Sequence, residues 1–125
     1  MLLDHVDLRV GDFNRTRALY DAILPAMGYT RINAGDESAG YHLPGETGAE
    51  PFLWIVSDTS HRPNGTRIAL AARDRGEVDR LAEIARSNGA TAFEPPALIE
   101  EYGAKYYATF FEDAEGNKLE ICCRR

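Results

Sequence analysis

The sequence predicts an α+β fold in which one unit, made of a strand, a helix and three further strands, occurs twice. Three observations support this prediction. A strand pattern, an acidic residue, a helical pattern and a glycine follow one another in each half of the chain. The offset between the halves stays nearly constant, at 62 residues from His5 to Arg67 and 61 from Gly28 to Gly89. Three short strand patterns follow each helix. A constant offset over a whole strand-helix unit is typical of an internal repeat.

The first half begins with residues 2–10, which alternate between apolar and polar side chains and therefore predict a strand. Asp12 is placed to cap a helix over residues 13–27, whose apolar side chains recur at helical spacing. Gly28 fits the position just after a helix end. Short apolar or β-branched runs predict three more strands, at 29–33, 39–43 and 52–56.

The second half repeats this order, with a strand at 67–72, a helix at 76–88 and strands at 90–94, 106–111 and 118–123. The run Tyr106–Phe111 is aromatic and β-branched, which favours a strand. Pro95 and Pro96 are expected to break the chain after the short strand and to begin a loop. We therefore expect one domain over 1–125 with modules at about 1–57 and 66–123.

Composition and charge exclude several classes of protein. The chain has 125 residues, of which 44% are hydrophobic and 27% charged, as in an ordinary globular domain. A net charge of −6 argues against a nucleic-acid partner. No apolar run approaches the roughly 20 residues of a membrane span, and no targeting segment is evident. Cys122 and Cys123 are adjacent and cannot form a disulfide framework, so a cytoplasmic location is expected.

Strand alternation predicts which side chains face a shared cavity. Neither half can close a core alone, so we expect the two sheets to curl around a central cup with the helices outside. The cavity-facing side of the opening strands then carries His5, Asp7 and Arg67. Superposing the fourth strand of one half on that of the other pairs Trp54 with Glu120.

Three segments carry a family resemblance, namely Asp4–Val10 with the helix behind it, Gly65–Ala72 with Glu77-Val78-Asp79, and Tyr106–Glu120. The last is the most specific, because it joins an aromatic strand, an Asp-x-x-Gly-Asn turn and a strand with a central glutamate. Over almost its whole length the chain resembles the vicinal oxygen chelate superfamily, which includes glyoxalase I, bleomycin-resistance proteins and extradiol dioxygenases.

The resemblance implies paired βαβββ modules and a cup that holds a divalent metal in many members. His5 and Glu120 match two of the metal ligands, whereas Arg67 and Trp54 stand where other ligands are usual. A guanidinium stays protonated and an indole offers only an N–H donor, so neither binds a metal. We therefore expect a divergent member with an incomplete ligand set and either no cofactor or a weakly held Zn, Ni, Fe or Mn ion.

The candidate site follows from this comparison. Glu120 and Arg67 are the candidate catalytic residues, and His5 and Glu120 are the metal ligands if a metal is bound. The candidate ligand-binding residues are His5, Asp7, Trp54, Tyr107 and Phe52. We expect Arg67 to form an ion pair with Glu120. Other residues that could contribute are His42 and His61 as substitute metal ligands, Phe110 in an aromatic wall and Tyr102 in a lid.

Three functions remain open at this point. The first is a glyoxalase-like small-molecule-binding protein or metal-free enzyme that acts on a small oxygen-bearing organic ligand in a cavity with His5, Arg67 and Glu120. The second is a divalent-metal-dependent lyase or dioxygenase. The third is a resistance-type protein that sequesters a cationic compound. The resemblance also implies a homodimer.

Overall fold

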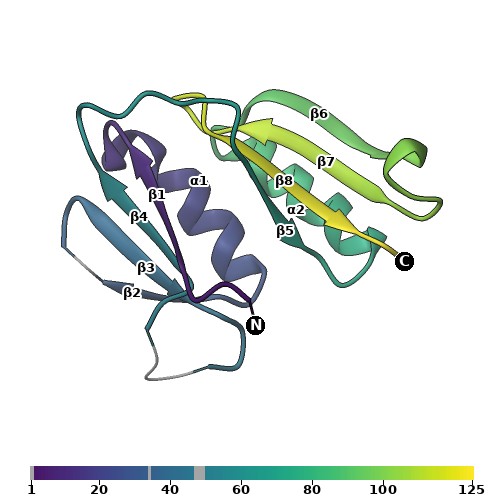
Figure 1. Cartoon of the computed structure of the whole chain (residues 1–125), viewed down its shortest axis with the longest axis horizontal. Helices are drawn as coiled ribbons and strands as arrows, with labels where there is room; N and C mark the ends of the chain where they lie inside the picture. The colour runs from purple at the N-terminus through teal and green to yellow at the C-terminus, as the bar shows by residue number, and fades with distance from the viewer. Residues whose placement is uncertain (1, 34, 47–49) are drawn as a thin grey trace. The chain divides into compact units, whose positions relative to one another are not determined.

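The computed structural model describes residues 2–33, 35–46 and 50–125. The chain forms two compact units, Met1–Arg62 and Pro63–Arg125, and each is described by itself. Each unit contains a four-stranded sheet with one helix packed against one face (Figure 1). Among the described residues, no helix has both the length and the apolar character needed to cross a membrane.

The first unit is built from β1 (Val6–Val10), α1 (Phe13–Ala26), β2 (Thr30–Asn33), β3 (Ser38–His42) and β4 (Leu53–Ser57). Its strand order is β1-β4-β3-β2. β1 runs parallel to β4, and the other neighbours are antiparallel. Strand β1 begins at Val6, four residues later than expected, so that His5 lies immediately before it.

The second unit repeats this arrangement with β5 (Arg67–Ala71), α2 (Arg75–Ser87), β6 (Thr91–Leu98), β7 (Tyr107–Glu112) and β8 (Lys118–Cys123). A short 3-10 helix, η1 (Glu100–Tyr102), precedes β7. The strand order β5-β8-β7-β6 and the parallel pair β5–β8 match the first unit strand for strand. The predicted α+β class with two βαβββ modules is therefore confirmed.

Side-chain caps explain where the helices begin. The Asp12 carboxylate accepts a hydrogen bond from the backbone N–H of Asn14 at 3.0 Å, as predicted for this position. The Ser57 hydroxyl accepts a second one from the N–H of Phe13 at 2.9 Å and thereby ties α1 to β4. Asp74 caps α2 in the same way, through the N–H of Glu77 at 2.8 Å.

The turn between β7 and β8 fixes the strand that carries Glu120. Asp113 is fully buried, and its carboxylate accepts hydrogen bonds from the backbone N–H of Glu115 at 2.9 Å and of Asn117 at 3.0 Å. The Asn117 side-chain amide donates to the same carboxylate at 2.8 Å. The Asp-x-x-Gly-Asn motif thus closes a tight turn, in which Gly116 adopts a φ of 98° that favours glycine.

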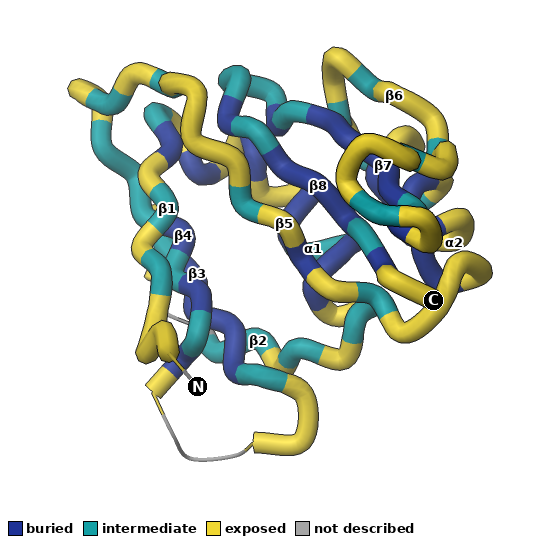
Figure 2. The backbone as a smooth tube through the Cα atoms, turned by 45° about the vertical axis from the view of Figure 1, so that its right-hand side comes forward, coloured by how far each residue is buried: buried dark blue, intermediate teal, exposed yellow. Residues whose placement is uncertain are grey.

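Alternation along the strands buries one face of each sheet against its helix. In the second unit, Leu119 and Ile121 of β8 pack on the side of α2, where Val78 and Leu81 are also buried. Glu120 lies between them on the opposite face and is nevertheless buried, so β8 is covered along most of its length on both sides (Figure 2). Something other than the helix therefore covers Glu120.

Strand β6 differs from the expectation, because it continues through Pro95 and Pro96 as far as Leu98. β6 is an edge strand and pairs with β7 alone. The register shifts between Thr91 and Glu94 and again between Glu94 and Ala97, and neither proline is among the paired residues. Proline has no N–H to donate to a neighbouring strand, so it is tolerated in an edge strand at positions where the pairing is already irregular.

Candidate functional site

The registers of the two sheets place Trp54 and Glu120 at equivalent positions. Trp54 lies opposite Asp7 of β1 and Gly40 of β3. Glu120 lies opposite Ala69 of β5 and Phe110 of β7, the corresponding strands of the second sheet. The superposition of Trp54 on Glu120 that the repeat predicts is therefore confirmed at the level of strand register.

Both residues lie on the sheet face opposite the helix. In the first unit the Tyr41 hydroxyl donates to Asp21 of α1 at 2.7 Å, which marks the helix-covered face, and Trp54 has the other parity. In the second unit the Tyr107 hydroxyl donates to Asp79 of α2 at 2.7 Å, and Glu120 has the other parity. We call these the open faces of the two sheets.

On the open face of the second unit, Glu120 is buried by aromatic side chains. Its carboxylate accepts a hydrogen bond from the Tyr106 hydroxyl, and the two residues are only 6% and 7% exposed. Tyr106 belongs to an apolar cluster with Ala108 and Phe110, against which Ile99 and Cys122 pack, and Phe110 lies opposite Glu120 in the sheet. A buried carboxylate needs such a donor, because burial without a partner is costly.

Tyr106 was not among the predicted site residues, although its parity in the chain places it on the face of Phe110. Burial raises the pKa of its phenol well above the usual range, and its hydrogen bonds to Cys122 and Glu120 act in the same direction. Burial also raises the pKa of the Cys122 thiol. At neutral pH Tyr106 therefore stays protonated and acts as a hydrogen-bond donor to Glu120. Cys122 is a poor nucleophile, because the thiolate is the reactive form of cysteine.

Arg67 does not form the expected ion pair with Glu120. Within the described part of the chain, its guanidinium carbon lies 4.8 Å from the centre of the Phe110 ring, and no carboxylate lies within ion-pair distance. Glu120 already accepts the Tyr106 hydroxyl, and the ring face of Phe110 offers the guanidinium a cation–π contact. Arg67 also lines a pocket of about 180 Å³ together with Glu94, Ile99, Glu101, Tyr102 and Phe110.

On the open face of the first unit, His5 and Trp54 line one pocket of about 430 Å³, with Asp4, Asp7, Glu50, Pro51 and Val56. His5 Nδ1 lies 2.7 Å from Asp4 Oδ1, and Nε2 lies 4.0 Å from Asp7 Oδ1. The hydrogen bond with Asp4 raises the pKa of His5. Phe52 lines a neighbouring pocket of about 450 Å³ with Leu2, Leu3, Asp4, Leu43, Glu46 and Glu50.

The remaining candidates, His42, His61 and Tyr107, lie in three different environments. His42 of β3 shares the parity of Gly40 and is buried, and its Nδ1 has no hydrogen-bond partner among the described residues. His61 follows β4 in a loop, where its backbone N–H donates to Asp58. Tyr107, expected among the ligand-binding residues, lies on the helix-covered face, where its hydroxyl is taken by Asp79 and Arg75 lies over its ring at 5.2 Å.

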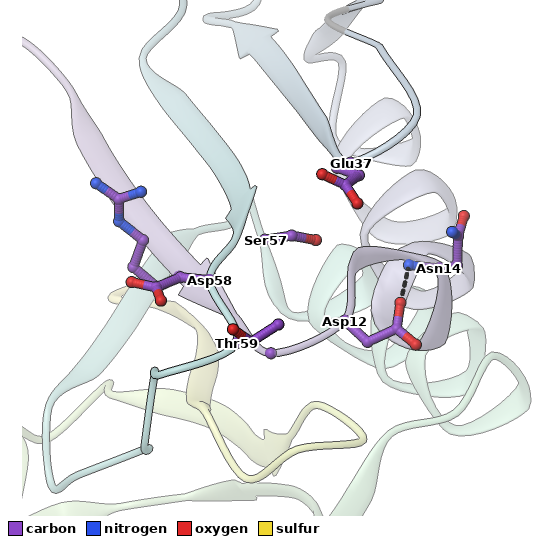
Figure 3. Close-up of a pocket in the computed structure, with 8 residues that line it drawn as sticks. Asp12, Asn14, Glu37, Ser57, Asp58 and Thr59 are labelled. Atoms are coloured by element: carbon purple, nitrogen blue, oxygen red, sulfur yellow. Dashed lines mark hydrogen bonds between the residues drawn. The ribbon is translucent and has the colours of Figure 1, made fainter.

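Another pocket, of about 550 Å³, is lined by none of the predicted site residues. It lies at the start of α1 and is lined by Arg9, Gly11, Asp12, Asn14, Glu37, Ser57, Asp58 and Thr59 (Figure 3). The hydrogen bonds of Asp12 and Ser57 serve the first turn of the helix. Hydrogen bonds from Ser60 lower the pKa of Asp58. These contacts stabilise local structure.

The described residues do not fit a resident divalent metal. Within 2–33, 35–46 and 50–125, no three His, Cys, Asp or Glu side chains gather closely enough to hold one. Arg67 and Trp54 cannot ligate a metal, and one oxygen of Glu120 accepts the Tyr106 hydroxyl. A tight catalytic site for zinc uses three protein ligands, which this donor set does not supply.

Comparison with known proteins identifies the family. The model of the glyoxalase/bleomycin resistance protein/dioxygenase superfamily matches residues 2–121, so the chain belongs to that superfamily. A comparison with the curated proteins finds no match.

Several solved structures share the fold. A glyoxalase/bleomycin resistance protein from Albidiferax ferrireducens T118 is 24% identical with a TM-score of 0.81, and the alignment covers 100% of both chains. The fosfomycin resistance protein FosX from Listeria monocytogenes is 19% identical with a TM-score of 0.72, covering 98% of this chain and 93% of its own. A glyoxylase/bleomycin resistance protein/dioxygenase domain from Frankia sp. EAN1pec is 22% identical with a TM-score of 0.72, covering 100% and 98%. At these identities the likeness concerns the fold.

Proposed function

We propose that this protein is a glyoxalase-like small-molecule-binding protein or metal-free enzyme, whose ligand is a small oxygen-bearing organic molecule. The proposed residues are His5, Asp7, Trp54 and Phe52 of the first unit and Arg67 and Glu120 of the second. Tyr107 is left out, because its hydroxyl is bound to Asp79 on the helix side. The observation that carries the proposal is made on the open face of the second sheet. There a buried carboxylate held by Tyr106 and an arginine that pairs with no carboxylate of the described residues share an aromatic surface.

Each group has a chemical task in this proposal. The guanidinium of Arg67 presents N–H donors that suit a carbonyl, carboxylate or enolate oxygen. Phe110 holds that guanidinium at its ring face and leaves the edge of the planar group available. Glu120 is the group that would exchange a proton with a bound substrate, and the Tyr106 hydroxyl holds its carboxylate in place. Trp54 and Phe52 supply apolar surface.

The first test is metal and ligand binding, measured on wild type and on Arg67→His. We expect calorimetric titration with Zn²⁺, Ni²⁺ and Mn²⁺ to show no tight stoichiometric site in the wild type. Nuclear magnetic resonance titration with a panel of small carboxylates and hydroxyketones should perturb residues of the second unit's open face. Arg67→Gln should abolish those shifts, while Arg124→Gln should not. Arg124 is the matched control, because it lies over the Tyr106 ring at 4.6 Å but does not line the pocket of Arg67.

A tight metal in the wild type would overturn this proposal in favour of the metal-dependent lyase or dioxygenase. A metal site gained only in Arg67→His would support it, because the arginine alone would then account for the lost ligand. Ligand shifts that are unchanged in Arg67→Gln would remove Arg67 from the site.

A resistance-type binder of a cationic compound is the second candidate, and the pocket of the first unit favours it. Asp4, Asp7 and Glu50 place three carboxylates around Trp54. An indole face and carboxylates together suit an organic ammonium ion. Trp54 is the chain's single tryptophan, so its fluorescence reports directly on this pocket. Tetramethylammonium should quench it in wild type and less in Asp7→Asn. A response equal to that of an uncharged isostere would count against this function.

Members of the superfamily commonly bind small molecules and form dimers. We propose a homodimer and a cytoplasmic location here too. Cys122 is half-buried and Cys123 buried, both as free thiols. Light scattering should give twice the chain mass of 13.9 kDa, and a particle of the chain mass itself would remove the dimer.

A further inference from the structure

The small pocket on the open face of the second unit combines charges of both signs with apolar walls. It is lined by Arg67, Glu94, Ile99, Glu101, Tyr102 and Phe110. One guanidinium and two carboxylates therefore meet beside two aromatic rings and an isoleucine. This composition differs from that of the acidic pocket on the first unit, whose histidine is its single basic side chain.

The three charged side chains of this pocket are not paired with one another. In the described part of the chain, no ion pair joins Arg67 to Glu94 or to Glu101. Other arginines of the same unit do find carboxylates, since Arg73 pairs with Glu77 and Arg86 with Glu83. Arg67 contacts the Phe110 ring instead. A guanidinium that lies on a ring keeps its N–H donors available at the edge.

Backbone hydrogen bonds hold the walls in place before any ligand arrives. The N–H of Tyr102 donates to Ile99 at 3.0 Å, and the N–H of Ile99 donates to Tyr106 at 2.8 Å. The rings of Tyr102 and Tyr106 meet edge to face with their centres 5.5 Å apart. On the neighbouring strand, the backbone oxygen of Glu94 accepts the hydroxyl of Thr109 at 2.7 Å. Such preorganisation lowers the entropic cost of binding.

We propose that this pocket binds a small zwitterion, an amino carboxylate with an apolar side chain. The proposal rests on the function proposed above and names its ligand class. The ligand's carboxylate binds the guanidinium of Arg67, and its ammonium group binds Glu94 and Glu101. The apolar side chain lies against Phe110 and Ile99.

Charge complementarity selects this class over simpler ones. A ligand with only a negative charge would meet two carboxylates, and a ligand with only a positive charge would meet Arg67, so each is disfavoured at one end. The volume of about 180 Å³ matches a compact molecule. It equals the space of about six water molecules, which suits a single small amino acid.

The experiment compares L-leucine with its two halves, isocaproate, which lacks the ammonium group, and isopentylamine, which lacks the carboxylate. Binding to the full chain is measured by calorimetry and by amide shifts. We expect L-leucine to bind at least ten times more tightly than either analogue. Arg67→Gln should weaken L-leucine binding at least tenfold and leave isopentylamine binding unchanged or tighter. Glu94→Gln with Glu101→Gln should weaken L-leucine binding and leave isocaproate binding unchanged or tighter. Arg124→Gln should change none of these affinities.

Two results would overturn the inference. If isocaproate binds as tightly as L-leucine and still depends on Arg67, the pocket takes plain carboxylates, and the broader proposed function stands without the zwitterion. If none of the three probes binds, the zwitterion is excluded. The panel of carboxylates and hydroxyketones then decides the broader function separately. All variants change exposed side chains, and thermal unfolding confirms that each remains folded.

Discussion

Replacing Tyr106 by phenylalanine removes one hydroxyl from the cluster that buries Glu120. The Tyr106 ring remains, so packing with Ala108 and Phe110 is retained. The carboxylate of Glu120, in a residue only 6% exposed, loses its buried donor. A hydrogen bond to a charged group contributes about 1.5–3 kcal/mol, and an unpaired buried group adds its own cost. We therefore expect Tyr106→Phe to lower the free energy of unfolding by about 2–3 kcal/mol.

The neighbouring residue offers a matched control. The Tyr107 hydroxyl also donates to a carboxylate, at 2.7 Å, but its acceptor Asp79 is exposed to solvent. Water replaces such a bond readily, so Tyr107→Phe should cost less than about 1 kcal/mol. Urea denaturation of wild type and both variants at neutral pH measures the difference. Equal losses for the two tyrosines would refute the reasoning that burial makes the Tyr106 bond matter.

A double variant tests whether the unpaired carboxylate of Glu120 accounts for the loss of stability in Tyr106→Phe. Replacing both partners of a buried hydrogen bond by apolar groups is far less costly than leaving one of them unpaired. Adding Glu120→Leu to Tyr106→Phe should therefore recover part of the lost stability. If the double variant is less stable than Tyr106→Phe alone, the carboxylate of Glu120 has another partner that stabilises it.

The remaining predictions concern the first unit. Gly40→Ala should cost about 1–3 kcal/mol in urea denaturation, since a Cβ there would lie 2.7 Å from Pro51 Cγ. Gly65→Ala should change stability little, because no atom of the described residues lies within 4 Å of a Cβ at that position. Asp4→Asn should lower the pKa of His5, measured by proton resonance of the imidazole, because the hydrogen bond that the imidazole donates to the Asp4 carboxylate raises this pKa. Because the pKa of His5 is raised in the folded state, its contribution to the free energy of unfolding is complete below about pH 6.5 and is lost as the pH rises through the raised pKa. A wild type that becomes more stable over that pH window would contradict the raised pKa of His5. Asp12→Ala should cost about 1 kcal/mol by loss of the helix cap, and an unchanged midpoint would show that the cap is dispensable.

Much of the fold could be predicted because it depends on local patterns. The repeat offset and strand alternation were enough to place Trp54 and Glu120 at equivalent positions on the open faces, as the strand registers show. The start of the first helix followed from its capping residue Asp12, and the helix ends followed from the glycine after each helix. Strand alternation and helix capping each involve residues that are close together in the chain.

The partners of the site residues could not be predicted in the same way. The hydroxyl of Tyr106 reaches Glu120 across 14 residues of sequence, and Arg67 finds Phe110 instead of Glu120, because β5, β7 and β8 become neighbours only in the folded sheet. Tyr107 is a different case. Phe110 lies three residues further along the strand, so the two side chains have opposite parity. Strand alternation alone would therefore have placed Tyr107 on the helix side.

The two prolines of β6 also affect how the second sheet meets other chains. A sheet usually grows at an edge strand, whose free N–H and C=O groups template a new strand. Pro95 and Pro96 remove two successive donors from the outer strand of this sheet, and the register shifts beside them interrupt its regularity. Strand β6 therefore cannot recruit a continuous partner strand, so that the second sheet is protected from fibril-like association along this edge.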